Sequence, residues 1–243
     1  MEFTYEAYLD LLSNIKKHGF IFADYETCDN YERCVILRHD IDYSLDKAVK
    51  LAEIEASEGV SSTYFTLISS EFYNPIAKEN YDKIHGIQEL GHKIGLHFDE
   101  MNYGIKLTET DIKKKIIDEI RLMEQILNID IKSVSMHRPS KQTLEADYQL
   151  GSIVNSYGKK FFKDFKYVSD SRRRWREDIN RIIDSGEYNK LHILTHAFWY
   201  NEKDESIEAS IGKFIKNGNA DRYNMLERNI TDLGSIIPKE GVK

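Results

Sequence analysis

Two carboxylates two positions apart are the most informative chemical feature of the sequence. They are Asp40 and Asp42, in the stretch Arg-His-Asp-Ile-Asp that begins at position 38. In an extended chain, side chains at i and i+2 point to the same side, so one carboxylate can hold a metal ion while the other accepts a proton. The alternative is structural, because Asp42 would also suit the start of a helix, where acidic residues cap free N–H groups. The pair alone does not separate these interpretations.

Histidines recur where short apolar stretches end. His97 closes Gly-His-Lys-Ile-Gly-Leu-His, His137 lies in Ser-Val-Ser-Met-His, and His196 follows Leu-His-Ile-Leu-Thr. Neutral imidazole is a common ligand of zinc-like metals. In the second stretch the polar residues, Ser135 and His137, share a strand face opposite to the apolar ones. This parity directs His137 inward and leaves Arg138 more peripheral.

Other histidines and aromatic residues have plainer interpretations. His92 begins a predicted strand instead of ending one, so we interpret it as a structural residue at the opposite end of the fold. Phe198 and Trp199 follow His196, and aromatic faces of this kind suit the apolar faces of sugar rings. Ordinary packing is the alternative for both, and it is favoured more for Phe198.

The elements that must position these residues alternate between strand and helix. Short apolar stretches predict strands at 34–40, 62–68, 92–97, 131–137, 167–169 and 191–195. Helical spacing predicts helices from Ser44 to just before Gly59, over 76–90 and 111–128, near 177–185 and within 205–214.

This alternation predicts an α/β fold with a mostly parallel sheet, and a barrel is the form that leaves no exposed edge. In parallel barrels the loops after the strands meet at one mouth. Asp40, Asp42, His97, His137 and His196 all lie at or just beyond predicted strand ends, so we expect the fold to gather them there.

Length and composition favour one catalytic domain over residues 1–243. We see no linker, repeat, membrane span or export signal, which predicts a cytoplasmic protein. Two cysteines, Cys28 and Cys34, do not make a disulfide framework, and we expect both as reduced thiols. The net charge of −7 argues against nucleic-acid binding. The arginines around 172–176 suit a solvated loop, or a single phosphate or carboxylate in preference to a duplex.

Taken together and in this order, the motifs resemble the polysaccharide deacetylase superfamily, the carbohydrate esterase group that includes the nodulation chitooligosaccharide deacetylases. The likeness runs from about residue 35 to about residue 199. Arg-His-Asp-Ile-Asp resembles the first motif, which would make Asp40 the catalytic base and Asp42 a metal ligand. Gly-His-Lys-Ile-Gly-Leu-His resembles the second motif, which would make His97 the first metal histidine. The resemblance implies a distorted (β/α) barrel with fewer than eight repeats.

The later motifs complete the resemblance. Met-His-Arg-Pro-Ser resembles the third motif and maps to His137 or Arg138, while Tyr-Val-Ser-Asp-Ser-Arg-Arg-Arg-Trp resembles the fourth, which contributes Asp170 and the aromatic wall of Trp175. Ile-Leu-Thr-His resembles the fifth motif, whose histidine is the general acid, here His196. The substrate-binding residues expected on this basis are Arg138, Asp170, Trp175 and Trp199.

The sequence departs from the family pattern at one metal ligand. The usual second motif has another histidine four residues after the first, where this chain has Met101, a poor ligand for such metals. The strand parity indicates that His137 supplies the third ligand beside Asp42 and His97. Two histidines and one carboxylate suit a divalent metal, zinc first, with cobalt, iron or nickel as alternatives. The chain looks closest to an intracellular branch with His-Asp-x-Asp signatures.

The function implied is metal-dependent removal of an N-acetyl or other N-acyl group from an amino sugar or a polysaccharide precursor. One alternative is a metal-dependent amidohydrolase acting on a different C–N bond. Another is a carbohydrate-binding homologue that has lost turnover with the missing histidine, and metal content would separate it from an enzyme.

Overall fold

A computed structural model describes residues 1–104 and 107–239 of the chain. It divides the chain into two compact units, residues 1–202 and 203–243, and all the strands lie in the first. The helices of the first unit are α1 (Tyr5–Lys17), α2 (Leu45–Ser57), α3 (Lys78–Glu89), α4 (Glu109–Leu127), α5 (Lys141–Glu145), α6 (Lys160–Lys163) and α7 (Ile179–Ser185), with short 3-10 helices η1 (Cys28–Asn30), η2 (Glu100–Tyr103) and η3 (Ala197–Trp199). The strands are β1 (Ile21–Ala23), β2 (Cys34–Ile41), β3 (Thr63–Thr66), β4 (Lys93–Asp99), β5 (Ser133–His137), β6 (Val154–Asn155), β7 (Lys166–Ser169) and β8 (Lys190–Thr195).

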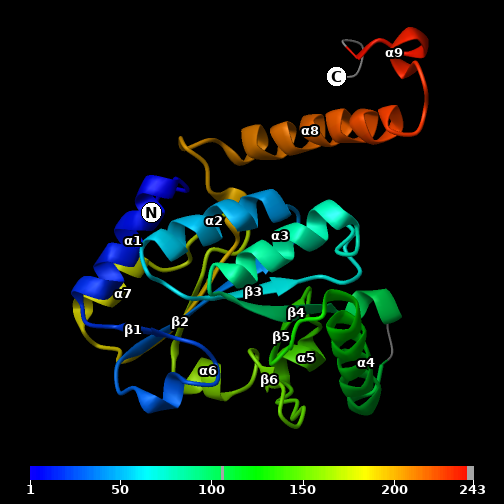
Figure 1. The fold of residues 1–243 in the computed structure, drawn as a ribbon. Coiled ribbons are helices and arrows are strands. Elements are labelled where there is room, and N and C mark those ends of the chain that lie inside the picture. Colours follow the sequence, from blue (N-terminus) through cyan, green and yellow to red (C-terminus); the bar gives the residue numbers. More distant parts are fainter. Residues whose placement is uncertain (105–106, 240–243) are drawn as a thin grey trace. The chain divides into compact units, whose positions relative to one another are not determined.

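One parallel sheet organises the first unit (Figure 1). Its strands run in the order β6-β5-β4-β3-β2-β8-β7, and every pairing in it is parallel. Strand β1 pairs with the first half of β2, and β3 pairs with the second half. Since all the strands run in the same direction, their carboxyl ends share one edge of the sheet.

The sheet is strongly curled. The Ser135 hydroxyl on β5 lies 3.2 Å from both carboxylate oxygens of Asp40 on β2, although two other strands stand between these two in the sheet. In a flat sheet, three strand spacings of about 4.8 Å would keep them roughly 14 Å apart. The predicted α/β fold with a distorted, incomplete barrel is therefore confirmed. Within the described residues β6 and β7 do not pair, so the barrel stays open at that seam.

All eight residues of strand β2 are buried, and it pairs with three strands, β1, β3 and β8. Helix α2 follows it directly and begins where the Ser44 side chain accepts a hydrogen bond from the Lys47 N–H, as the sequence predicted. The apolar face of α2, with Leu45, Ala48 and Leu51, is buried. Helices α2 and α3 pack side by side over the sheet (Figure 1).

Some elements of the structure were not predicted from the sequence. Helix α1 was not predicted, although Thr4 caps it and its buried positions recur at helical spacing. Strand β6, with two residues, is too short for a periodic signal. The two thiols, Cys28 and Cys34, are buried and free, as expected for reduced cysteines.

The second unit consists of helix α8 (Ile207–Glu227) and the short helix α9 (Leu233–Ile236). The Ser206 hydroxyl caps α8, and the Tyr223 hydroxyl donates to the carbonyl of Ile237 to join the two helices. The sequence placed a helix within 205–214, and α8 extends well beyond it. No helix among the described residues is long and apolar enough to cross a membrane.

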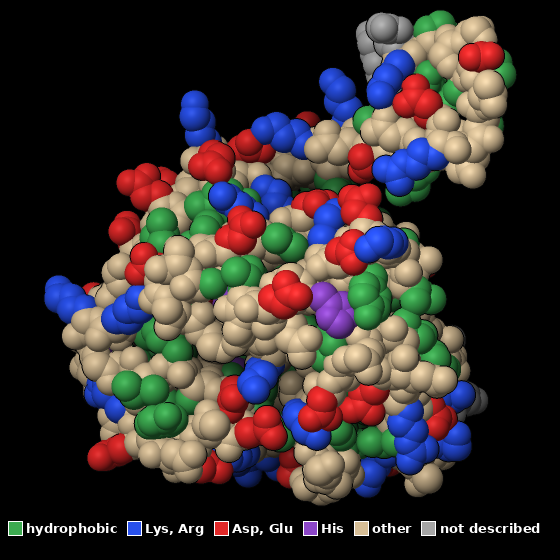
Figure 2. Space-filling view, viewed as in Figure 1, with side chains coloured by type: hydrophobic (Ala, Val, Ile, Leu, Met, Phe, Trp, Pro, Cys, Tyr) green, Lys and Arg blue, Asp and Glu red, His purple; other side chains and the backbone are tan. Residues whose placement is uncertain are grey.

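On the face shown in Figure 2, acidic and basic side chains are interspersed. No continuous basic area appears on that face.

The buried carboxyl group of Glu119 on α4 makes stability depend on pH. Burial raises its pKa to about 7, against a hydrogen bond from the Tyr103 hydroxyl that lowers it. Between its ordinary value of 4.5 and about 7, the folded protein keeps a proton that the unfolded chain releases. The free energy of unfolding therefore falls as the pH rises through this window. We expect Glu119→Gln to remove this loss and to stabilise the protein by about 2 kcal/mol at pH 8.

Thermal unfolding of both proteins between pH 4 and pH 8 measures the effect of Glu119. The exposed Glu89 on α3 provides a control, since Glu89→Gln should leave the pH dependence as in the wild type. A Glu119→Gln protein that lost stability with rising pH as steeply as the wild type would contradict the assignment.

Candidate metal centre

The carboxyl ends of four strands bring distant polar residues together. Asp40 and Asp42 come from the end of β2, His97 from β4, His137 from β5 and His196 from just beyond β8. Asp40 and His97 are almost fully buried, whereas Asp42, His137 and His196 keep 12 to 19% of their side-chain surface exposed. The cluster is thus held by the core and still reached from solvent.

Three of these residues direct ligand atoms at one another. The Asp42 Oδ1 atom lies 3.2 Å from His97 Nε2 and 3.1 Å from His137 Nδ1, and the two ring nitrogens lie 3.1 Å apart. Asp42, His97 and His137 thus form a group whose ligand atoms all lie within 4.8 Å of one another.

The geometry of this group fits a divalent cation. Ligands at about 2.0–2.1 Å in a tetrahedral arrangement lie about 3.3 Å apart, close to the separations seen here. Hydrogen bonds alone explain these three short distances less well, because each ring N–H can point at only one of the two other ligand atoms. A cation between the three atoms satisfies all of them at once. The set of two imidazoles and one carboxylate leaves open positions for water and substrate.

The electrostatics of Asp42 suit the same role. Burial raises its pKa, but hydrogen bonds from His137 and His97 outweigh burial and hold the pKa well below its usual range. The carboxylate is therefore ionised, as a metal ligand must be. His97 Nδ1 is buried and has no hydrogen-bond partner among the described residues, so no second hydrogen bond fixes its tautomer.

Asp40 lies beside this group and is held differently. Its carboxylate accepts from the Ser135 hydroxyl, and its Oδ2 atom lies 3.5 Å from Nη2 of Arg38 and 3.9 Å from Nε2 of His97. Arg38 is fully buried, and its guanidinium also donates to the Ser156 hydroxyl. Asp40 therefore lies beside the candidate metal position, farther from His97 Nε2 than Asp42 is and held in place by Ser135 and Arg38.

His196 also lies next to the group. Its Nδ1 lies 2.6 Å from Oδ1 of the buried Asp170, and the other Asp170 oxygen accepts from the His196 backbone N–H at 3.1 Å. This pairing directs Nε2 towards Asp42, whose Oδ2 is 3.8 Å away. Burial lowers the pKa of His196, but the Asp170 carboxylate outweighs burial and raises it to about 9.

No protein-family model and no curated protein matches the chain. Several solved structures do. A family 4 carbohydrate esterase from Bacillus anthracis is 16% identical, with a TM-score of 0.44 over 87% of this chain and 84% of that one. A family 4 acetyl xylan esterase from Clostridium thermocellum, solved with a cobalt ion, is 12% identical, with a TM-score of 0.43 over 67% and 73%.

A carbohydrate esterase family 4 pseudoenzyme from Bacillus anthracis is 16% identical, with a TM-score of 0.45 over 77% of this chain. The chain spans 62% of that protein, less than two thirds of its length. This chain is structurally similar to carbohydrate esterase family 4 proteins. The similarity is at low sequence identity and concerns the fold, and it assigns no role to a residue of this chain.

Several residues predicted for the site lie at its edge. Arg138, at the end of β5, forms an ion pair with Asp99 at the end of β4, and 56% of its side-chain surface is exposed. Trp199 is 6% exposed and packs on Phe198 and Tyr43, so most of its surface is already used in packing. Trp175 is half-buried in the loop after β7. Asp170, also predicted to bind substrate, is fully buried and contacts His196. The substrate-binding roles of Arg138, Asp170, Trp175 and Trp199 stay predictions.

Met101 lies in η2 and is 53% exposed, outside the ligand group. His137, whose ring nitrogen lies beside Asp42 and His97, is therefore the third member of the candidate ligand group. His92, predicted to be structural, donates from Nε2 to the carbonyl of Ala52 and accepts at Nδ1 from the Ser62 backbone N–H.

Sequence reasoning missed a buried polar network behind the site. The Glu55 carboxylate on α2 accepts from the hydroxyls of Tyr8 and Tyr64 and contacts Nε2 of His39 at 2.7 Å. The other ring nitrogen of His39 contacts the Thr195 hydroxyl at 2.6 Å. The network thus joins β2 to β8 next to Asp40 and His196. His39, between Arg38 and Asp40 in a fully buried strand, was the available signal.

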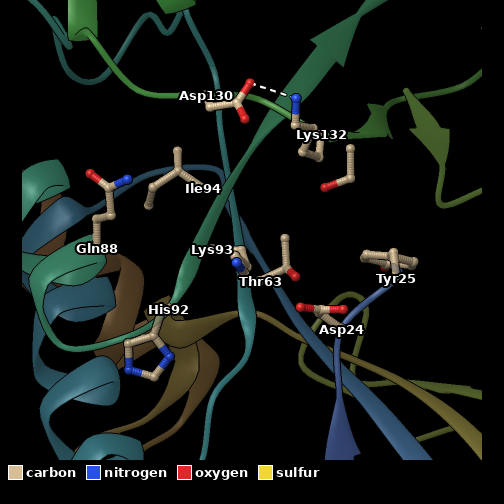
Figure 3. A pocket seen from close by; sticks show the side chains of 10 residues that line it. Asp24, Tyr25, Thr63, Gln88, His92, Lys93, Ile94, Asp130 and Lys132 are labelled. Carbon is tan, nitrogen blue, oxygen red and sulfur yellow. Dashed lines mark ion pairs between the residues drawn. The ribbon is translucent and has the colours of Figure 1, made fainter. Parts of the chain in front are cut away.

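A cavity of about 140 Å³ lies elsewhere, among the amino ends of β3, β4 and β5 (Figure 3). Thr63, Lys93 and Ser133 line it, together with the ion pair between Lys132 and Asp130. None of its lining residues belongs to the ligand group, so this cavity is separate from the candidate metal centre.

Proposed function

We propose that the protein is a metal-dependent hydrolase that removes an N-acetyl or related N-acyl group from an amino sugar or a polysaccharide precursor. The observation that carries the proposal is the convergence of Asp42, His97 and His137, with Asp40 and His196 both within 4 Å of the group. This arrangement contains a metal-ligand set, a carboxylate base and an imidazole acid in one accessible place.

A divalent metal held by Asp42, His97 and His137 would polarise the amide carbonyl and lower the pKa of water. Asp40 takes the proton from the attacking water, because its carboxylate is oriented by Ser135 and Arg38 and lies next to His97. His196 donates a proton from Nε2 to the departing amine, which is otherwise a poor leaving group. Asp170 holds the His196 ring in the orientation that this step needs.

Aromatic side chains near the ligand group favour a sugar substrate. Tyr43 directly follows Asp42 in the chain, and its ring packs against Phe72 at 5.2 Å and Phe198 at 4.9 Å between centroids. Phe72 is 53% exposed. Rings of this kind bind the apolar faces of sugars, which favours an amino sugar over a small formyl or ring amide.

His196 provides the test of the acid step. We expect His196→Gln to slow hydrolysis of N-acetylglucosamine oligomers by roughly 10² or more, because the amine then leaves without a proton. An activated acetate ester, whose leaving group needs little protonation, should be much less affected. Rates with both substrates at equal metal content measure the difference. Equal losses on amide and ester would contradict the assignment of His196 as the acid.

Other parts of the account stay predictions. They are the identity of the metal as zinc, the cytoplasmic location, the absence of nucleic-acid partners and the interpretation of residues 1–243 as a single catalytic domain. The residues proposed for the site all belong to the unit formed by residues 1–202.

A further inference from the structure

The loop after β7 carries a run of arginines that the proposed reaction does not use. Arg172, Arg174 and Arg176 are exposed, and none of the three forms an ion pair with a described residue. The chain as a whole has a net charge of −7, so this basic loop is a local feature. Most runs of surface charge are simply solvated, so exposed arginines alone do not make a binding site; the backbone and the location of this loop distinguish it.

The backbone of the loop adopts a conformation that non-glycine residues rarely take. Arg172 and Arg173 are consecutive and have φ values of 61° and 55°, in the left-handed region. Arg138, at the end of β5, has a φ of 48°, so three of the five described non-glycine residues with positive φ follow strands at the mouth of the barrel. Strained backbone of this kind concentrates at ligand sites.

Hydrogen bonds hold the loop against the catalytic residues. The Arg174 N–H donates to the carbonyl of Asp170 at 3.0 Å, and the Ser171 N–H donates to the Ser169 hydroxyl at 3.0 Å. Asp170 is the partner of His196, so the turn that presents the arginines is anchored on the general-acid pair. Two residues of chain span at most about 7 Å, which keeps Arg172 close to that pair.

We propose that this loop, residues 171–176, binds a phosphate or diphosphate group carried by the amino-sugar substrate. Guanidinium groups bind phosphate oxygens through paired N–H donors, and several arginines on one turn match a group with more than one negative charge. A carboxylate, with a single charge and two oxygens, matches several arginines less well. That the bound molecule is an amino sugar rests on the proposed function, whereas binding of a phosphate group by the loop does not.

The test compares a double variant with a matched control. Arg172→Gln with Arg174→Gln removes two exposed charges and should leave the fold intact. Arg121→Gln changes an exposed arginine on α4 and serves as the control. Calorimetric titration with N-acetylglucosamine 1-phosphate, UDP-N-acetylglucosamine and neutral N-acetylglucosamine measures binding in chelator-treated protein, where no hydrolysis interferes.

We expect the wild type and the Arg121→Gln control to bind N-acetylglucosamine 1-phosphate at least roughly tenfold more tightly than the neutral sugar. The double variant should lose this preference while unfolding at the wild-type temperature. Tighter binding of the UDP sugar would indicate a nucleotide-linked substrate, and equal binding of both phosphates would indicate that the phosphate alone is recognised, as on a lipid-linked precursor.

Equal affinity of the wild type for the phosphorylated and neutral sugars would overturn the proposal, as would a double variant that kept the preference. The two proposals fail in different ways. A protein that bound the phosphate through the loop and never hydrolysed an N-acyl group would contradict the proposed function and leave the anion site standing.

Discussion

His137→Ala should release the metal and abolish most of the hydrolysis. The Nδ1 atom of His137 lies 3.1 Å from both its partners, Asp42 Oδ1 and His97 Nε2, so its removal leaves two ligands. Loss of a residue that only supports a ligand weakens metal binding about 10–100-fold, and loss of a ligand itself should weaken it by at least this factor. We expect substoichiometric metal after purification without chelator, and hydrolysis reduced by roughly 10² or more.

Metal content and amide hydrolysis are measured on the same preparation of each protein. His85→Ala is the matched control, because His85 binds the carbonyl of Leu127 on α4 far from the ligand group. The control should retain full metal and full activity. A His137→Ala protein with one tightly bound metal would contradict the role of His137, and the third ligand would then have to be sought elsewhere.

Asp40→Asn should separate the base from the metal ligands. Asparagine keeps the shape of the side chain and its hydrogen bond with Ser135, but it cannot accept the proton. We expect turnover to fall by roughly 10² to 10⁴ with the metal still bound. Asp42→Asn provides the contrast, because that change weakens a ligand and should lower the metal content as well.

Turnover and metal stoichiometry together distinguish the two carboxylates. If Asp40→Asn lost its metal while Asp42→Asn kept it, the two roles would have to be exchanged. Near-normal hydrolysis by the Asp40→Asn protein with stoichiometric metal would exclude Asp40 as the base.

Much of the site could be predicted because strand parity and strand ends are local properties. The buried run that forms β2, the Ser44 cap of α2 and the alternation in β5 are all visible in the sequence. The alternation of side chains along the strand predicted that His137 points inward. The structure places its ring nitrogen beside Asp42 and His97. Met101 was set aside on ligand chemistry, since its thioether is a poor ligand for such metals, and it lies exposed in η2.

Other features depend on long-range geometry that sequence periodicity does not contain. The contact between Ser135 and Asp40 exists only because the sheet curls across the strands between them. The interaction of Arg38 with Ser156 joins β2 to the residue after β6, 118 positions away. The open seam between β6 and β7 was likewise invisible, since a two-residue strand leaves no pattern.

The conformation of the arginine loop could not be predicted either. A run of arginines after a short strand is typical of a solvated turn, and nothing in the residue types predicts two consecutive left-handed residues. The bond from Arg174 back to Asp170 depends on that conformation. Helix α8 was predicted too short because Gly212 and Gly218 weaken its helical pattern.

The most direct test of the metal centre is anomalous diffraction from crystals of the protein purified without chelator. One peak should lie about 2.0–2.2 Å from a carboxylate oxygen of Asp42, from His97 Nε2 and from His137 Nδ1. Asp40 and His196 should lie outside the coordination sphere. A metal bound away from these three residues, or a His137 ring turned away from Asp42 and His97, would contradict the account.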